Sequence, residues 1–134
     1  MPCLRQAAIT FDWSISGWYS IWFVAIGSDE TAACRRHGIS VTAYCPIARG
    51  KVVDDPVIVG IAKTHGRTPA QVALKWLIQQ PGVIAIPRTS SKARLAENLD
   101  IDGFELLAPE MDAIAGLAHA GGRLVNVAWS PKWD

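Results

Sequence analysis

The stretch TPAQVALKWLIQQPGVIAIPRTSSKARLAEN, residues 68–98, places a helix, a short strand and a second helix in direct succession. Thr68 and Gln71 form a capping box around Pro69, a combination that is typical of a helix start. A Pro-Gly pair ends this helix, and residues 83–86 are apolar at every position, which predicts a buried strand. Within the helix, apolar residues recur at the three- and four-residue spacing of a buried face: Ala70, Ala73, Leu74, Leu77 and Ile78.

Upstream, the same alternation of helix and strand continues. Gly38 suits the left-handed cap of a helix over residues 31–37. Residues 39–44 are apolar and partly β-branched, which predicts a strand that is followed by a loop. Asp55 as cap and Pro56 at the first position then open a helix that ends at a His-Gly pair.

Downstream, two more helices are expected. One covers about residues 91–99, with Leu95 and Leu99 as its buried pair, and the last covers about residues 109–118. Strands that are apolar on both faces and are joined by helices indicate a parallel sheet covered by helices. Two strands cannot close such a sheet, so the pattern predicts a piece of a larger α/β fold.

Composition excludes several classes of protein. Half of the 134 residues are hydrophobic and 19% are charged, which excludes a chain that is disordered by composition. The net charge of +1 gives neither the basic surface of a nucleic-acid binder nor a polybasic membrane motif. Three cysteines (Cys3, Cys34 and Cys45) suggest no disulfide framework and no metal site, so inert thiols in the cytoplasm are expected.

The first 31 residues differ from the rest because they are apolar and rich in aromatic residues. Their longest uncharged stretch is shorter than the roughly 20 residues that a spanning helix needs. A secretory signal is a weaker alternative, since Arg5 is the one basic residue and Asp12 borders the apolar run. We therefore expect no membrane association.

Residues 86–98 carry the strongest indication of a binding site. Arg88, Lys92 and Arg94 surround the start of a helix, where the positive end of the dipole disfavours cations. Ser90 or Ser91 can cap this helix, and its free N–H groups together with the arginines would bind a phosphate. The alternative is a capped surface helix with solvated arginines.

Several motifs in the same order resemble the aldo/keto reductase family, in particular its bacterial 2,5-diketo-gluconate-reductase-like members. They are IPRTSSKARLAEN (86–98), ISVTAYCPIARG (39–50), RTPAQVALKWLIQQPGVIAIPR (67–88) and RLVNVAWSPKWD (123–134). The resemblance implies the C-terminal part of a TIM (β/α)₈ barrel: the last two or three βα units, the C-terminal helix and the tail. It covers residues 32–134 as a partial domain and leaves residues 1–31 as an atypical segment. A complete barrel takes about 200 residues or more, so an incomplete barrel from a truncated or rearranged reading frame is expected.

The resemblance also implies a site for NADP. Tyr44 matches the residue that stacks on the nicotinamide ring. Arg88 and Thr89 match residues that contact the 2′-phosphate, with Ser90 beside them, and Arg94 matches the arginine that binds this phosphate and stacks on the adenine. The pyrophosphate would lie along Cys45, Ile47 and Arg49, and the adenine edge would meet Glu97 and Asn98.

The family's reaction is the reduction of aldehydes and ketones to alcohols by NADPH, so the implied partner is a small carbonyl substrate. In the family the general-acid tyrosine and its lysine, histidine and aspartate partners precede the matched segment. The surroundings of Tyr19 do not resemble that tyrosine motif, so no catalytic residue is assigned and the chain alone is expected to be inactive. Trp129 and Trp133 would line a substrate pocket or serve only in packing.

Two further expectations concern assembly. Open strand edges would favour self-association. The alternative to a reductase fragment is a non-catalytic nucleotide-binding or assembly fragment that a partner chain completes.

Overall fold

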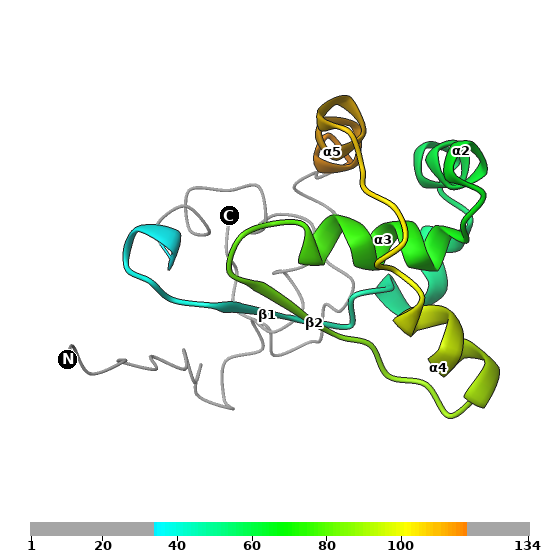
Figure 1. Ribbon diagram of the computed structural model, residues 1–134, viewed down its shortest axis with the longest axis horizontal. Helices are drawn as coiled ribbons and strands as arrows, with labels where there is room; N and C mark the ends of the chain where they lie inside the picture. Colours follow the sequence, from blue (N-terminus) through cyan, green and yellow to red (C-terminus); the bar gives the residue numbers. More distant parts are fainter. Residues whose placement is uncertain (1–33, 118–134) are drawn as a thin grey trace, which may run out of the picture.

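The computed structural model describes residues 34–117, and residues 1–33 and 118–134 lie outside this described part. Two strands and four α-helices alternate along it, together with one 3₁₀ helix in the segment that was expected to be a loop (Figure 1). In chain order the elements are β1 (Val41–Tyr44), η3 (Ala48–Val53), α2 (Pro56–His65), α3 (Pro69–Ile78), β2 (Val83–Ile86), α4 (Lys92–Leu99) and α5 (Ala108–Ala115). The order confirms the α/β class.

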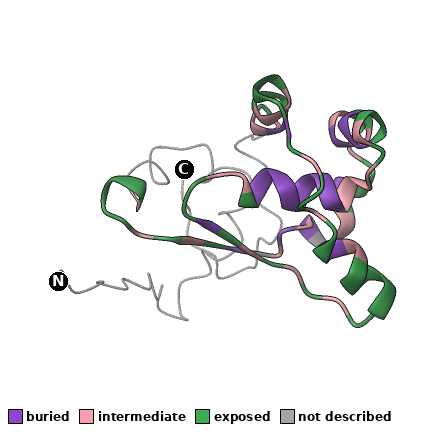
Figure 2. Ribbon diagram, in the orientation of Figure 1, coloured by how far each residue is buried: buried purple, intermediate pink, exposed green. Residues whose placement is uncertain are grey.

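The two strands pair in parallel, as predicted. Their register runs from Val41 opposite Val83 to Tyr44 opposite Ile86. The sheet is covered on one face only within the described residues: Ala43 is fully buried against the helices, whereas Ile84 is 53% exposed. The expectation of strands buried on both faces is therefore wrong for this part of the chain, because α3 packs against β2 while other positions along this strand remain exposed (Figure 2).

Helix α3 forms the centre of the core. It lies between the sheet and the helix pair α2 and α5 (Figure 1). The predicted apolar face is confirmed at Ala73, Leu74 and Leu77, which are buried, but Ile78 is 36% exposed. Burial also extends around the helix to Val72, because α3 is in contact with four other elements: η3, α2, β2 and α4.

Local capping explains where the helices begin and end. The Asp55 carboxylate accepts the N–H groups of Val57 at 2.9 Å and Ile58 at 3.2 Å, and α2 ends at Gly66 with a left-handed φ of 60°. The capping box at the start of α3 is present as predicted. A polar N-cap of this kind stabilises a helix by about 1 kcal/mol. Gly38 likewise has a φ of 65° directly after helical residues 34–36.

Helix α4 buries a different face from the one that was predicted. Leu95 and Leu99, which were expected to be its buried pair, are 53% and 70% exposed, and Asn98 is instead the buried residue. Polar groups of α3, described below, hold α4 by its last turn, and this docking turns the two leucines outward. None of the helices in residues 34–117 has the length and apolar character that crossing a bilayer requires.

Candidate cofactor-binding site

The parallel register brings the two predicted groups of site residues to one edge of the sheet. Tyr44 and Ile86 are opposite each other at the carboxyl ends of β1 and β2. The loop after β1 and the approach to α4 therefore begin side by side. In sheets covered by helices, the loops after the carboxyl ends of parallel strands are the usual place for ligands.

The loop after β1 has an unusual backbone. Cys45 and Ala48 adopt positive φ angles of 57° and 46°, which are uncommon for residues other than glycine. The loop is tightened by hydrogen bonds from the Ala48 N–H to the Cys45 carbonyl, 2.9 Å, and from the Gly50 N–H to the Ile47 carbonyl, 2.7 Å. Ile47 packs against the core, and Arg49 lies within η3. Local strain of this kind occurs often at binding loops.

The second group of predicted residues follows β2. Arg88, Ser90 and Arg94 are exposed and Thr89 is half-buried. The Ser91 hydroxyl accepts the Arg94 N–H at 3.4 Å and so caps α4, which decides between the two serines considered above. The Thr89 hydroxyl in turn accepts the Ser91 N–H at 3.1 Å.

The charge around this helix start is entirely positive. The first turn of α4 contains no acidic residue, and neither Arg88 nor Arg94 forms an ion pair with another residue of the described range 34–117. Two exposed guanidinium groups thus flank the positive end of a helix dipole along the chain. The arrangement would bind an anion of high charge.

Further along α4, the two predicted adenine-edge residues differ in their environments. Glu97 is half-buried, and its Oε1 accepts a hydrogen bond from the Thr68 hydroxyl at 2.6 Å. Asn98 is only 6% exposed. Glu97 also lies one helical turn after Arg94, so these two side chains share a face of α4.

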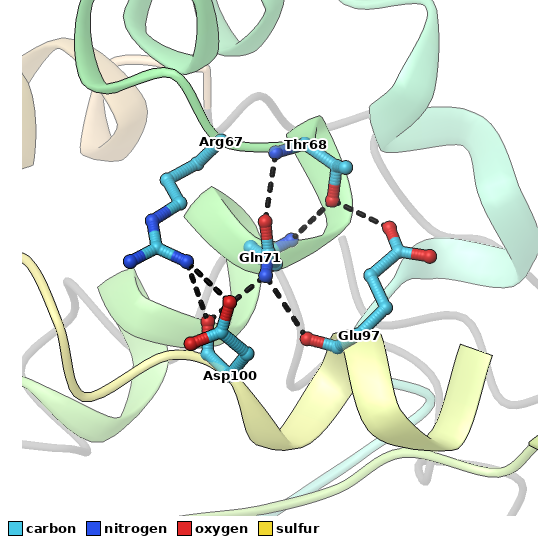
Figure 3. A network of polar contacts seen from close by, with 5 residues as sticks. All are labelled: Arg67, Thr68, Gln71, Glu97 and Asp100. Carbon is cyan, nitrogen blue, oxygen red and sulfur yellow. Dashed lines mark hydrogen bonds and ion pairs between the residues drawn. The ribbon is translucent and has the colours of Figure 1, made fainter. Parts of the chain in front are cut away.

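Glu97 belongs to a polar network that the sequence did not reveal. Figure 3 shows its five members, Arg67, Thr68, Gln71, Glu97 and Asp100, which connect the start of α3 with the end of α4. Thr68 and Gln71 were predicted only as the capping box of α3. Their partners on α4 lie 26 to 29 residues away in sequence, so no local pattern could have identified them.

A second polar contact lies between α2 and α5. His65 Nε2 is 2.9 Å from both carboxylate oxygens of Glu110, and the Glu110 carboxylate also accepts the Leu107 N–H at 2.8 Å. Burial acts to raise the pKa of Glu110, but the Leu107 N–H and His65 together lower it below its ordinary value. His65, at the end of α2, therefore joins two helices.

Two predicted residues cannot be placed. Trp129 and Trp133 lie outside the described residues. Among residues 34–117, no group of three or more histidine, cysteine, aspartate or glutamate side chains is arranged to hold a metal ion.

Comparison with known proteins decides the family. A sequence model described as the aldo/keto reductase family matches residues 11–119, which is most of the chain. The chain belongs to the aldo/keto reductase family. This confirms the resemblance inferred from the motifs, and membership implies the TIM-barrel fold, of which the described residues form an α/β part.

Individual relatives agree with this assignment. An aldo-keto reductase of Mycolicibacterium smegmatis is 46% identical to this family member over 81 residues, which are 60% of the chain and 28% of the relative. A crystal structure whose name proposes a 2,5-diketo-D-gluconic acid reductase B is 42% identical with a TM-score of 0.76, over 84% of this chain and 40% of that one. An aspartate-to-alanine variant of Gox0644, crystallised with NADPH, is 38% identical with a TM-score of 0.68, over 75% and 36%.

The extent of these matches has two consequences. The aldo/keto reductase chain described here spans less than half the length of each of these three relatives. The family match also begins at residue 11, inside the segment that we expected to be atypical. The domain boundary that we placed between residues 31 and 32 stays a prediction.

Proposed function

We propose that the chain carries the part of an aldo/keto reductase that binds the 2′-phosphate and adenine of NADP(H). The observation that supports this most directly is the surface formed by Arg88, Arg94 and the start of α4. Its two cations are exposed and have no acidic partner among the described residues.

The chemistry of these groups fits a phosphate monoester. A guanidinium group presents N–H donors in a planar fork that matches phosphate oxygens, and the N-terminus of α4 adds a favourable dipole. NAD lacks the 2′-phosphate and would leave both arginines without a partner. The proposed site should therefore prefer NADP.

The remaining positions are assigned by their place in the chain. Tyr44, Cys45, Ile47 and Arg49 follow β1 toward the same edge of the sheet, where they would receive the nicotinamide and pyrophosphate. The positive φ angles of Cys45 and Ala48 support this assignment, because they make the chain depart from a regular strand where the ligand would bind. Thr89 and Ser90 would complete the phosphate site.

The cofactor supplies a hydride, so the proposed reaction class is the reduction of small aldehydes and ketones to alcohols. We assign no catalytic residue, and we propose that residues 1–134 without further segments do not catalyse this reaction. The substrate class comes from the family alone, since Trp129 and Trp133 lie outside the described residues.

Calorimetric titration of the chain with NADP and with NAD tests the proposal. A charge-assisted hydrogen bond contributes about 1.5–3 kcal/mol, so NADP should bind at least about tenfold more tightly than NAD. Arg94→Ala should remove most of this preference. Lys92→Ala is the matched control, because Lys92 is an exposed cation on the same turn that is not part of the proposed site.

Two results would contradict the proposal. One is the failure of the unmodified chain to bind either nucleotide. The other is an equal loss of NADP preference in Arg94→Ala and Lys92→Ala, which would indicate general attraction between charges rather than a defined phosphate site.

A second candidate function is a nucleotide-binding or assembly fragment that another chain completes. It is favoured by the face of the two-stranded sheet that the helices of residues 34–117 leave exposed, where Ile84 and Ile86 are 53% and 44% exposed. Light scattering on the purified chain tests it. This candidate would be contradicted if the molar mass is that of a monomer at every protein concentration and an Ile84→Thr variant elutes from size-exclusion chromatography at the same volume.

A further inference from the structure

The Thr68 hydroxyl makes two hydrogen bonds with different purposes. Its oxygen accepts the Gln71 N–H at 3.2 Å, which is the ordinary capping contact of α3. Its single proton is donated to Glu97 Oε1 at 2.6 Å, on a different helix. Capping needs only the acceptor, so the bond to Glu97 is an additional feature that the start of α3 does not require.

The Gln71 side chain holds the backbone of the same helix. Its amide nitrogen donates to the carbonyls of Glu97 at 3.1 Å and Asp100 at 2.9 Å, while its oxygen accepts the Thr68 N–H at 3.0 Å. Gln71 is only 5% exposed, so these bonds are shielded from water. Backbone and side chain of Glu97 are thus both fixed from α3 (Figure 3).

This geometry leaves one end of the Glu97 carboxylate for a ligand. Oε1 is bonded to Thr68, and Oε2 accepts no hydrogen bond from the residues that Figure 3 draws around it. An ionised carboxylate is acceptor-only, so it favours a ligand edge that presents a donor. The exocyclic amino group of adenine is such a donor, whereas hypoxanthine carries a carbonyl oxygen at that position and would be repelled.

We propose that Thr68 is a positioning residue for base selectivity: its hydroxyl orients the Glu97 carboxylate so that a 6-aminopurine is accepted and a 6-oxopurine is rejected. This inference rests on the proposed NADP site. It goes beyond that site because it assigns selectivity for the base to a residue at the start of α3, more than twenty residues before α4.

The experiment compares dissociation constants for NADP and its hypoxanthine analogue, deamino-NADP, in which a carbonyl replaces the 6-amino group and N1 of the base carries a proton. Three variants of Thr68 test the role of its hydroxyl. Thr68→Ser keeps both the cap and the donor, whereas Thr68→Gly and Thr68→Val remove the hydroxyl without adding a charge beside Glu97. Circular dichroism confirms that each variant is folded.

The unmodified chain should prefer NADP over deamino-NADP by about tenfold or more, the contribution of one hydrogen bond to a charged group. Thr68→Ser should keep this ratio, and Thr68→Gly and Thr68→Val should reduce it to about one- to threefold. The preference for NADP over NAD should survive in Thr68→Gly, because Arg88 and Arg94 are untouched.

The outcomes separate this inference from the proposed function. If the unmodified chain binds neither nucleotide, the proposed function and the inference both fail. If it discriminates between the bases and Thr68→Gly discriminates equally well, Thr68 serves only as a cap and the inference alone is overturned. The Gly variant is decisive even if Thr68→Val does not fold, because glycine is about as good an N-cap residue as threonine.

Discussion

Replacing Gln71 by methionine removes the amide that fastens α4 to α3 while it keeps the length of the side chain. The three lost hydrogen bonds do not cost the same. The Glu97 carbonyl still accepts the Asp100 N–H at 3.2 Å, and the Asp100 carbonyl still accepts Arg67 Nη1 at 3.3 Å. Losing these two bonds should cost about 0.5–1 kcal/mol each.

The Thr68 N–H has no other acceptor among the described residues, so it becomes an unpaired and half-buried donor. An unpaired donor of this kind costs about 1 kcal/mol or more. The sum predicts that Gln71→Met lowers the free energy of unfolding by about 2–3 kcal/mol. With a urea m-value of about 1–2 kcal/mol/M for a chain of this size, the midpoint should fall by about 1–3 M.

Urea unfolding followed by circular dichroism measures this change, and Gln80→Met is the matched control. Within residues 34–117 the Gln80 amide bonds only to the Trp76 carbonyl one turn earlier, so its loss should cost less than about 1 kcal/mol. Amide hydrogen exchange should accelerate mainly in α4. Equal midpoints for the two variants, or faster exchange spread evenly over α2, α3 and α4, would refute the assignment of Gln71 as the fastening residue.

Two other predictions concern burial and pH. Leu77→Ala should lower the free energy of unfolding by about 2–5 kcal/mol because Leu77 is fully buried. Leu95→Ala should change it by less than about 0.5 kcal/mol, because Leu95 is 53% exposed. Similar losses for the two variants in a urea titration would contradict the orientation found for α4. Because the pKa of Glu110 is lowered in the folded state, its ionised form stabilises the fold above the ordinary value of 4.5, and this stabilisation is lost as the pH falls below it. Glu110→Gln should therefore be less stable than the unmodified chain at pH 6, with a smaller gap at pH 3.5, and a gap that is independent of pH would show that the carboxylate charge contributes nothing.

Features that depend on neighbours within a few residues could be predicted from the amino-acid sequence. The capping box at Thr68, the Asp55 cap, the left-handed Gly38 and the end of a helix at the His65-Gly66 pair were all predicted correctly, because a cap joins groups two to five residues apart. The apolar run of residues 83–86 matched the bounds of β2, and the order of helices and strands predicted the parallel pairing. The motifs also identified the family.

Tertiary packing, in contrast, decides which side of each element is buried and which distant residues meet. Periodicity predicted Leu95 and Leu99 inside, yet Asn98 is buried, since two carbonyls at the end of α4 bond to a glutamine of α3. Thr68 and Glu97 are 29 residues apart, and His65 and Glu110 are 45 apart. A local pattern records what a helix can present on each face, but the face that is used depends on where the neighbouring helices lie in space.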